Sequence, residues 1–329
     1  MEFKWRKSQL KPDALVIAKG LAEAHDITPY NQEQLADLIL SGLKTGEIEY
    51  EKKGASYYTK NIETWLNERL LKNTIILSAD DYKKALYRAF RLLVLADIAK
   101  TDFGSSRQRD FGQRWTDFTR GFLGEIGIKH FFEKNCGMEV ELEEKEVGAV
   151  EKFLPKDITN VKDKGQWRAV KCDVSIKTSK LRSMWLDIGS QLEHSEAFIF
   201  IKIGLTTDHL ISFFKSIGYL EELVDMGEEL GEVTGRKEEI KRLCSKIPDV
   251  NIFPAYIAGF VWKQDFKNSK LIIRETKKKK IITGGIGLFE KGIANGVEGL
   301  GDITPGKHLA CLSALRWSEK DWLELKKKM

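Results

Sequence analysis

Apolar residues recur at three- and four-residue spacing through much of the first hundred residues, which is the period of amphipathic helices. Pro29, Gly46 and Gly54 separate the periodic segments. The predicted helices cover 14–24, 32–43, 61–71 and 80–99. We therefore expect a helical N-terminal domain at residues 1–100.

The pattern changes after residue 100. A stretch rich in Gly, Ser and Arg at 101–120 leads into another helix near Trp115, and strand-like segments then alternate with helices. The expected strands cover 140–142, 169–178, 197–205 and 255–262, with helices at 209–226 and 237–246. The strand at 197–205 is almost continuously apolar, as in a central strand covered on both faces. This alternation indicates an α/β core at residues 101–265.

The last part of the chain, residues 266–329, begins with a strand at 271–275 and continues into a glycine-rich segment. Gly285 and Gly287 resemble the start of a nucleotide loop, but Glu290 stands where the third glycine is needed. Turns between short strands are the better interpretation. We expect a glycine-rich β extension that ends in a helix.

Composition and charge restrict the classes of protein to which this chain could belong. The 329 residues are 42% hydrophobic and 31% charged, which is typical of a folded protein with more than one structural unit. No apolar stretch approaches the roughly 18 residues of a membrane span, so we expect a soluble, cytoplasmic protein without a membrane partner. The four cysteines form no CxxC pair and are expected to be free thiols. A net charge of +5 permits nucleic-acid binding without requiring it.

Polar and apolar residues alternate strictly along 170–177, which predicts a strand with two different faces. The apolar face would hold Val170, Cys172, Val174 and Ile176. The polar face would hold Lys171, Asp173, Ser175 and Lys177. An ordinary half-exposed strand alternates in the same way, and a coherent polar site is the alternative.

The helix before this strand carries a carboxylate on an apolar stripe. Glu125 lies seven residues from both Phe118 and Phe132, and positions seven apart nearly superimpose on a helix. A buried carboxylate must meet a cation, a metal or a hydrogen-bond donor, unless Glu125 is a surface residue at the helix edge. Gly121, Gly124 and Gly127 on the same helix, spaced by three residues, indicate close packing on the sheet.

Two aspartates, Asp157 and Asp163, lie between the helix and the polar strand. Either could reach the polar face through a hairpin connection. Asp157 is the better candidate because it follows the apolar residues Phe153 and Leu154. As an isolated observation, its Pro-x-Asp sequence is also typical of a turn.

These features together resemble the PD-(D/E)xK nuclease superfamily, and specifically type II restriction endonucleases. The similarity comprises a helix glutamate, the Pro-x-Asp at Asp157, a strand with Asp173 and Lys177, the segment 185–195 and a following apolar strand, and it covers about 101–262. It implies a restriction-endonuclease-like mixed sheet flanked by helices. It also implies Mg²⁺-dependent, sequence-specific hydrolysis of double-stranded DNA by a homodimer.

The chain departs from the family pattern at Ser175, which stands where an acid is expected two residues before Lys177. In the preferred arrangement, Asp157 and Asp173 bind the metal. In the alternative, Asp173 is the first acid and Asp187 belongs to a degenerate second motif, which displaces Lys177. The resemblance assigns Lys177 to the attacking water and Glu125 to a second ion or a metal-bound water.

Basic residues on both sides of these motifs are candidates for DNA contacts, although each could be ordinary surface charge. They are Arg107, Arg109, Arg114, Arg120, Lys180 and Arg182. Two other functions remain open at this point. One is a DNA repair or junction-resolving nuclease, and the other is a catalytically inactive DNA-binding module in which Ser175 marks a lost site.

Overall fold

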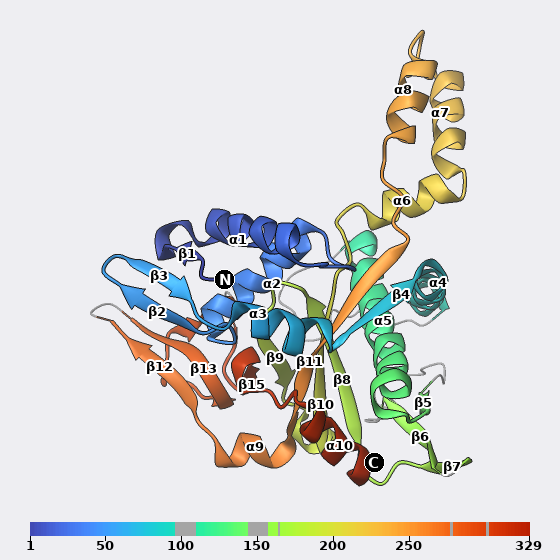
Figure 1. Ribbon diagram of the computed structural model, residues 1–329. Helices are drawn as coiled ribbons and strands as arrows, with labels where there is room; N and C mark the ends of the chain where they lie inside the picture. Colours follow the sequence, from blue (N-terminus) through green and yellow to red (C-terminus); the bar gives the residue numbers. More distant parts are fainter. Residues whose placement is uncertain (96–109, 144–156, 164, 277–278, 301–302) are drawn as a thin grey trace.

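The computed structural model describes residues 1–95, 110–143, 157–163, 165–276, 279–300 and 303–329 (Figure 1). Its central sheet has the strand order β4-β11-β10-β8. These strands are β4 (Thr74–Ser78), β8 (Val174–Lys180), β10 (Ala197–Ile203) and β11 (Ile252–Trp262). β10 runs parallel to β8, whereas β11 is antiparallel to both of its neighbours. The sheet is therefore mixed, and the chain is a mixed α/β protein.

Both faces of the central sheet are covered. Ile199 and Ile201 of β10 face a core that includes Phe131, whereas Phe198 and Phe200 face a second core that includes Leu35. Every residue of β10 is buried. The prediction of a central strand covered on both faces is thus confirmed.

One face of the sheet packs against α5 (Phe111–Cys136), beside α4 (Ala79–Leu95). α5 begins at Asp110, whose side chain accepts a hydrogen bond from Gln113 N–H at 2.7 Å. A Cβ at Gly124 would overlap Thr178 of β8, and one at Gly127 would crowd Ala255 of β11. Gly124 and Gly127 therefore allow the close helix–sheet approach that the glycine spacing predicted. The prediction is wrong for Gly121, because a Cβ there would meet nothing within 4 Å.

The N-terminal hundred residues differ from the predicted all-helical domain. Besides α4, their helical elements are η1 (Lys7–Gln9), α1 (Leu10–Ala24), α2 (Gln32–Thr45), α3 (Ile62–Thr64) and its continuation η2 (Trp65–Leu71). Three short strands form a separate sheet, namely β1 (Lys4–Trp5), β2 (Tyr50–Lys53) and β3 (Ser56–Thr59). β4 joins the central sheet, and Leu35 and Leu38 share one hydrophobic core with Phe198. The N-terminal region therefore shares a hydrophobic core with the central sheet.

The C-terminal region is β-rich, as expected. Its sheet has the order β12-β13-β15-β9, with β14 beside β13. These strands are β9 (Trp185–Gly189), β12 (Leu271–Glu275), β13 (Lys280–Phe289), β14 (Gly296–Val297) and β15 (Lys307–Cys311). β9 comes from the predicted core, so the two regions are interleaved. α9 (Lys263–Asn268) precedes this sheet, and the terminal helix α10 (Glu319–Lys328) contributes Trp322 to the core beside α5.

Two smaller groups of elements complete the fold. A three-stranded sheet of order β5-β6-β7 comprises β5 (Val140–Leu142), β6 (Ile158–Asp163) and β7 (Gln166–Ala169). α6 (His209–Ser216) leads into α7 (Tyr219–Glu229) and α8 (Lys237–Ser245). Figure 1 shows α7 and α8 as a helical hairpin that projects from the body of the molecule.

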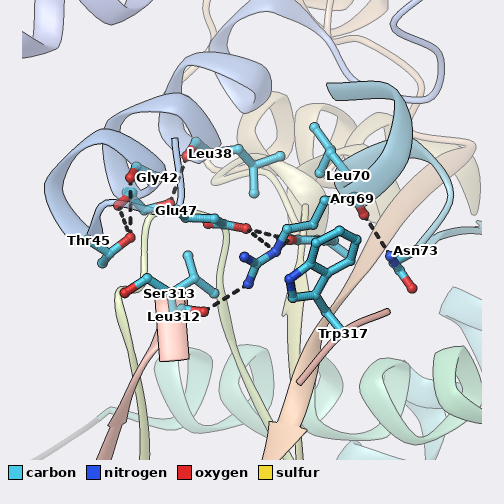
Figure 2. Close-up of polar contacts among 12 residues, drawn as sticks. Leu38, Gly42, Thr45, Glu47, Arg69, Leu70, Asn73, Leu312, Ser313 and Trp317 are labelled. Carbon is cyan, nitrogen blue, oxygen red and sulfur yellow. Dashed lines mark hydrogen bonds and ion pairs between the residues drawn. The ribbon is translucent and has the colours of Figure 1, made fainter. Parts of the chain in front are cut away.

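A buried ionic cluster joins α2, η2, the central sheet and the segment after β15. Glu47 Oε1 lies 2.9 Å from Arg69 Nε and accepts a hydrogen bond from Tyr256 Oη at 2.6 Å. Arg69 also donates to the carbonyl oxygen of Leu312 at 2.9 Å (Figure 2). Nearby, the fully buried Lys202 donates to Ser41 Oγ at 2.8 Å. Through this ion pair and these hydrogen bonds, the cluster links N-terminal, central and C-terminal segments.

Lys202 makes the stability of the fold depend on pH. Burial lowers its pKa from 10.5 to about 7. Between these two values the unfolded chain binds a proton that the folded chain does not, so this group makes stability rise with pH across that window. Lys202→Met should remove this rise and stabilise the protein near pH 7 by about 1–4 kcal/mol. Urea unfolding at several pH values, with the exposed Lys246→Met as control, measures the effect. An unchanged pH profile in Lys202→Met would contradict the assignment.

Candidate active site

Asp157 lies at the open edge of the central sheet, directly before β6. Its backbone N–H donates to Val174 O at 3.2 Å, so the chain runs beside β8. Its Oδ2 atom accepts hydrogen bonds from Ser175 Oγ at 3.2 Å and from the backbone N–H of Ile176. Burial raises the pKa of Asp157, while the Ile176 N–H, the charge of Lys177 and the Ser175 hydroxyl act in the opposite direction. The structure thus joins Asp157 to the polar face of β8.

Lys177 follows Ser175 by two residues on β8, so both side chains lie on the same face. Its Nζ atom donates to Gln191 Oε1 at 2.7 Å. Burial lowers the pKa of Lys177, against the opposing effect of the Asp157 and Asp187 carboxylates. An amine with a lowered pKa is better suited to accept or hold a proton near neutral pH.

The second carboxylate near Lys177 is Asp187 on β9. Its Oδ1 atom accepts the Gly189 N–H at 2.8 Å, and its Oδ2 atom lies 3.4 Å from Lys307 Nζ. Asp187 is partly exposed, and it is one of the two acids whose charge acts on Lys177. The acids next to the lysine are therefore Asp157 and Asp187.

Asp173 has a different environment from the one that strict alternation along 170–177 predicts. The predicted strand at 169–178 is interrupted, because β7 ends at Ala169 and β8 begins at Val174. Asp173 precedes β8, its N–H lies 3.3 Å from Glu196 Oε2, and its carbonyl oxygen accepts the Ala197 N–H. Asp173 thus lies directly before the first residue of β8, and its role as a metal ligand remains a prediction.

Glu125 meets a cation, which is one of the partners that its position on α5 requires. Its Oε2 atom lies 3.3 Å from Arg88 on α4. Arg88 also donates to the carbonyl oxygen of Glu143 at 2.8 Å, and the N–H of Glu143 donates to Asp157 O at 3.0 Å. Glu125 is thus connected to the Asp157 segment through Arg88, and a metal bound by Glu125 would compete with this ion pair.

A cleft of about 1590 Å³ opens between the N-terminal helices, the first turns of α5 and the end of β8. Lys180 and Arg182 are exposed and line it. Arg120 also lines it, but this side chain is buried and pairs with Asp117 at 2.8 Å. Arg114 is partly buried on the first turns of α5. Arg107 and Arg109 lie outside the described residues.

Two contacts of this site did not follow from sequence. Gln191 lies within the segment 185–195, but nothing in the sequence pattern assigned it to Lys177. Arg88 is one of several basic residues on α4, and only the packing of α4 on α5 selects it as the partner of Glu125. Asp163, the other candidate, pairs with Arg168 at 3.2 Å on the β6–β7 hairpin.

Mg²⁺ does not require a cluster of protein carboxylates. Among the residues that the structure describes, no three His, Cys, Asp or Glu side chains converge as a metal-binding group. Mg²⁺ commonly binds through one or two carboxylates together with phosphate oxygens and waters. Both hydrogen bonds to Asp157 use Oδ2, and its Oδ1 atom receives none from the described residues. The Oδ1 atom of Asp157 is therefore the carboxylate oxygen that could bind a hard cation.

Comparisons with protein families, with curated proteins and with solved structures found no match to this chain. No helix within the described part of the chain is long and apolar enough to span a bilayer. The chemistry of the site is therefore the basis for inferring its function.

Proposed function

We propose that this protein is a type II restriction enzyme, a Mg²⁺-dependent endonuclease that cuts double-stranded DNA at specific sequences. In this proposal the active protein is a homodimer. One observation carries the proposal: Asp157 is hydrogen-bonded to the strand that presents Ser175 and Lys177. A buried carboxylate with a raised pKa beside a lysine with a lowered pKa is the kind of environment found at catalytic sites.

Each side chain has a defined part in the proposed hydrolysis. Bound Mg²⁺ would neutralise charge on the scissile phosphate and lower the pKa of a bound water. Asp157 would hold the cation through Oδ1, with its Oδ2 atom fixed by Ser175 and Ile176. Lys177 would orient the attacking water or take its proton, and Gln191 would hold the lysine in position.

The DNA backbone would approach from the C-terminal end of β8, whereas Asp157 contacts the first residues of this strand. Lys180 and Arg182 are exposed where the strand ends and the cleft begins, three and five residues after Lys177. Lys and Arg at such a place bind phosphates without reading sequence. They would bring the scissile phosphate toward the Asp157 and Lys177 side chains.

Two observations favour a second candidate, a DNA-binding module without nuclease activity. Ser175 replaces the expected acid, and Glu125 is already paired with Arg88. Binding of DNA without cleavage under any divalent-metal condition would select this alternative.

Dependence on metal and salt tests the proposed chemistry. Cleavage of plasmid DNA should stop in excess EDTA and return when Mg²⁺ is added. DNA affinity should fall steeply with salt, because Lys and Arg release counterions from the DNA. Gel assays of cleavage and titrations of binding at several salt concentrations provide the two measurements. Full cleavage in excess chelator would exclude the mechanism.

The identity of the second acid is a separate prediction. Because Asp187 acts on Lys177 and Asp173 lies before the strand, Asp187→Asn should lower the single-turnover rate more than Asp173→Asn, by on the order of tenfold or more. Thermal unfolding of both variants controls for loss of folded protein. A larger loss of rate in Asp173→Asn would restore the arrangement that the sequence favoured.

A further inference from the structure

α7 carries an exposed apolar stripe on the projecting hairpin. Its members are Tyr219, Leu223, Met226 and Leu230. Their exposure is high, reaching 71% at Leu230. The spacing of four, three and four residues is the spacing of the seam between two packed helices. The stripe does not hold the hairpin itself together, since Leu220 and Val224 are the buried residues of α7.

α4 carries a second exposed apolar stripe with similar spacing. Tyr87, Phe90 and Val94 lie three and four residues apart, and Tyr87 is 66% exposed. The opposite face of α4, which includes Ala85 and Ala89, is buried in the core that contains α5. Adjacent exposed apolar side chains of this size are typical of a protein–protein contact.

The two stripes are bordered by opposite charges. Residues 219–246 contain eight Asp or Glu against five Lys or Arg, a net charge of −3 in a chain of net charge +5. Glu222 and Glu229 border the stripe of α7, seven residues apart. Lys84 and Arg91 border the stripe of α4 with the same separation. Opposite charges beside an apolar seam favour one partner helix over others.

The stripes belong to one continuous surface. Phe90 of α4 lies 5.7 Å from Trp115 between ring centroids, Trp115 lies 6.4 Å from Phe214, and Phe214 lies 5.3 Å from Tyr219. This aromatic row connects the basic stripe of α4 to the acidic stripe of α7. A two-fold axis would therefore bring the acidic stripe of each copy to the basic stripe of the other in one self-complementary contact.

We propose that α7 of one copy packs along α4 of a second copy, and that this reciprocal contact forms the dimer. The acidic hairpin is poorly suited to DNA, and the basic, apolar stripe of α4 provides a complementary partner within the same chain. The inference specifies the homodimer of the proposed function and rests on it for the identity of the partner.

Sedimentation velocity of the full chain over a range of concentrations tests the contact without any measurement of cleavage. Wild-type protein should sediment as a dimer, and Leu223→Glu with Leu230→Glu should weaken association by at least on the order of a hundredfold. Because both leucines are exposed, the folded monomer should be retained. Val16→Glu, which changes a residue 67% exposed on α1, is the matched control and should remain dimeric.

Reversing the charges that border the two stripes distinguishes specific pairing of α7 with α4 from nonspecific apolar association. Glu222→Lys with Glu229→Lys should weaken the dimer, and adding Lys84→Glu with Arg91→Glu should recover part of the loss. A wild-type monomer, or a Leu223→Glu, Leu230→Glu variant that associates as tightly as wild type, would overturn the interface. If such a monomer cleaves DNA, the interface is wrong but the nuclease proposal stands. If the wild-type protein is a dimer that never cleaves DNA, the interface stands and the nuclease proposal is wrong.

Discussion

Asp157→Asn is expected to lower the single-turnover cleavage rate by on the order of a thousandfold or more, with little loss of folded protein. The substitution removes the negative charge that would hold Mg²⁺. The amide oxygen of asparagine can still accept the hydrogen bonds from Ser175 and Ile176. Because burial already disfavours the charged carboxylate, the variant should unfold at a temperature similar to or above that of wild type.

Asp163→Asn is the matched control for this experiment. It makes the same chemical change at the other end of β6, where Asp163 pairs with Arg168 on an exposed hairpin. We expect near-normal cleavage from this control, because exposed ion pairs contribute little to stability. Equal losses in both variants would show that the effect is not specific to the Asp157 site.

Lys177→Met is expected to lower the cleavage rate by on the order of a hundredfold to ten-thousandfold while DNA affinity and folding are retained. Methionine keeps most of the length of the side chain but cannot hold a proton or donate to Gln191. Burial disfavours the lysine charge, whereas the Asp157 and Asp187 carboxylates favour it, so these two effects of its removal on the free energy of unfolding should largely cancel. Thermal unfolding, DNA binding and single-turnover cleavage of the same preparation separate these effects.

Lys171→Met is the control for Lys177. Sequence alternation predicted both lysines on one polar face, but Lys171 is exposed in the bend before β8. Its replacement should leave the cleavage rate close to that of wild type. Near-normal cleavage by folded Lys177→Met protein would remove the lysine from the mechanism.

The sequence predicted the elements whose pattern is local. The apolar strand at 197–205, the strand at 271–275 and the close approach of Gly124 to the sheet all depend on periodicity or on small residues within one segment. β4 was missed because Thr74–Ser78 is short and lies between helical patterns, and only its pairing with β11 makes it a strand. Short strands of this kind are determined by tertiary contacts more than by propensity.

In the candidate site, likewise, features set within one segment were predictable and contacts between segments were not. The polar residues Ser175 and Lys177 share a face because side chains alternate along β8, and this was predictable. Asp173 has the same sequence parity but lies one residue before β8, because the predicted strand at 169–178 is interrupted between β7 and β8. The contacts of Glu125 with Arg88 and of Lys177 with Gln191 depend on packing between separate elements, for which a single sequence carries little signal.

A nuclease centred on Asp157 and Lys177 should cut DNA at a defined sequence. The most direct measurement is digestion of a mixed-sequence plasmid with Mg²⁺ by wild-type protein and by Asp157→Asn, followed by sequencing of the fragment ends. We predict discrete wild-type fragments whose ends share one sequence, and intact plasmid with Asp157→Asn. Uncut plasmid with wild-type protein that nevertheless binds DNA, or the same fragments from both proteins, would contradict the claim.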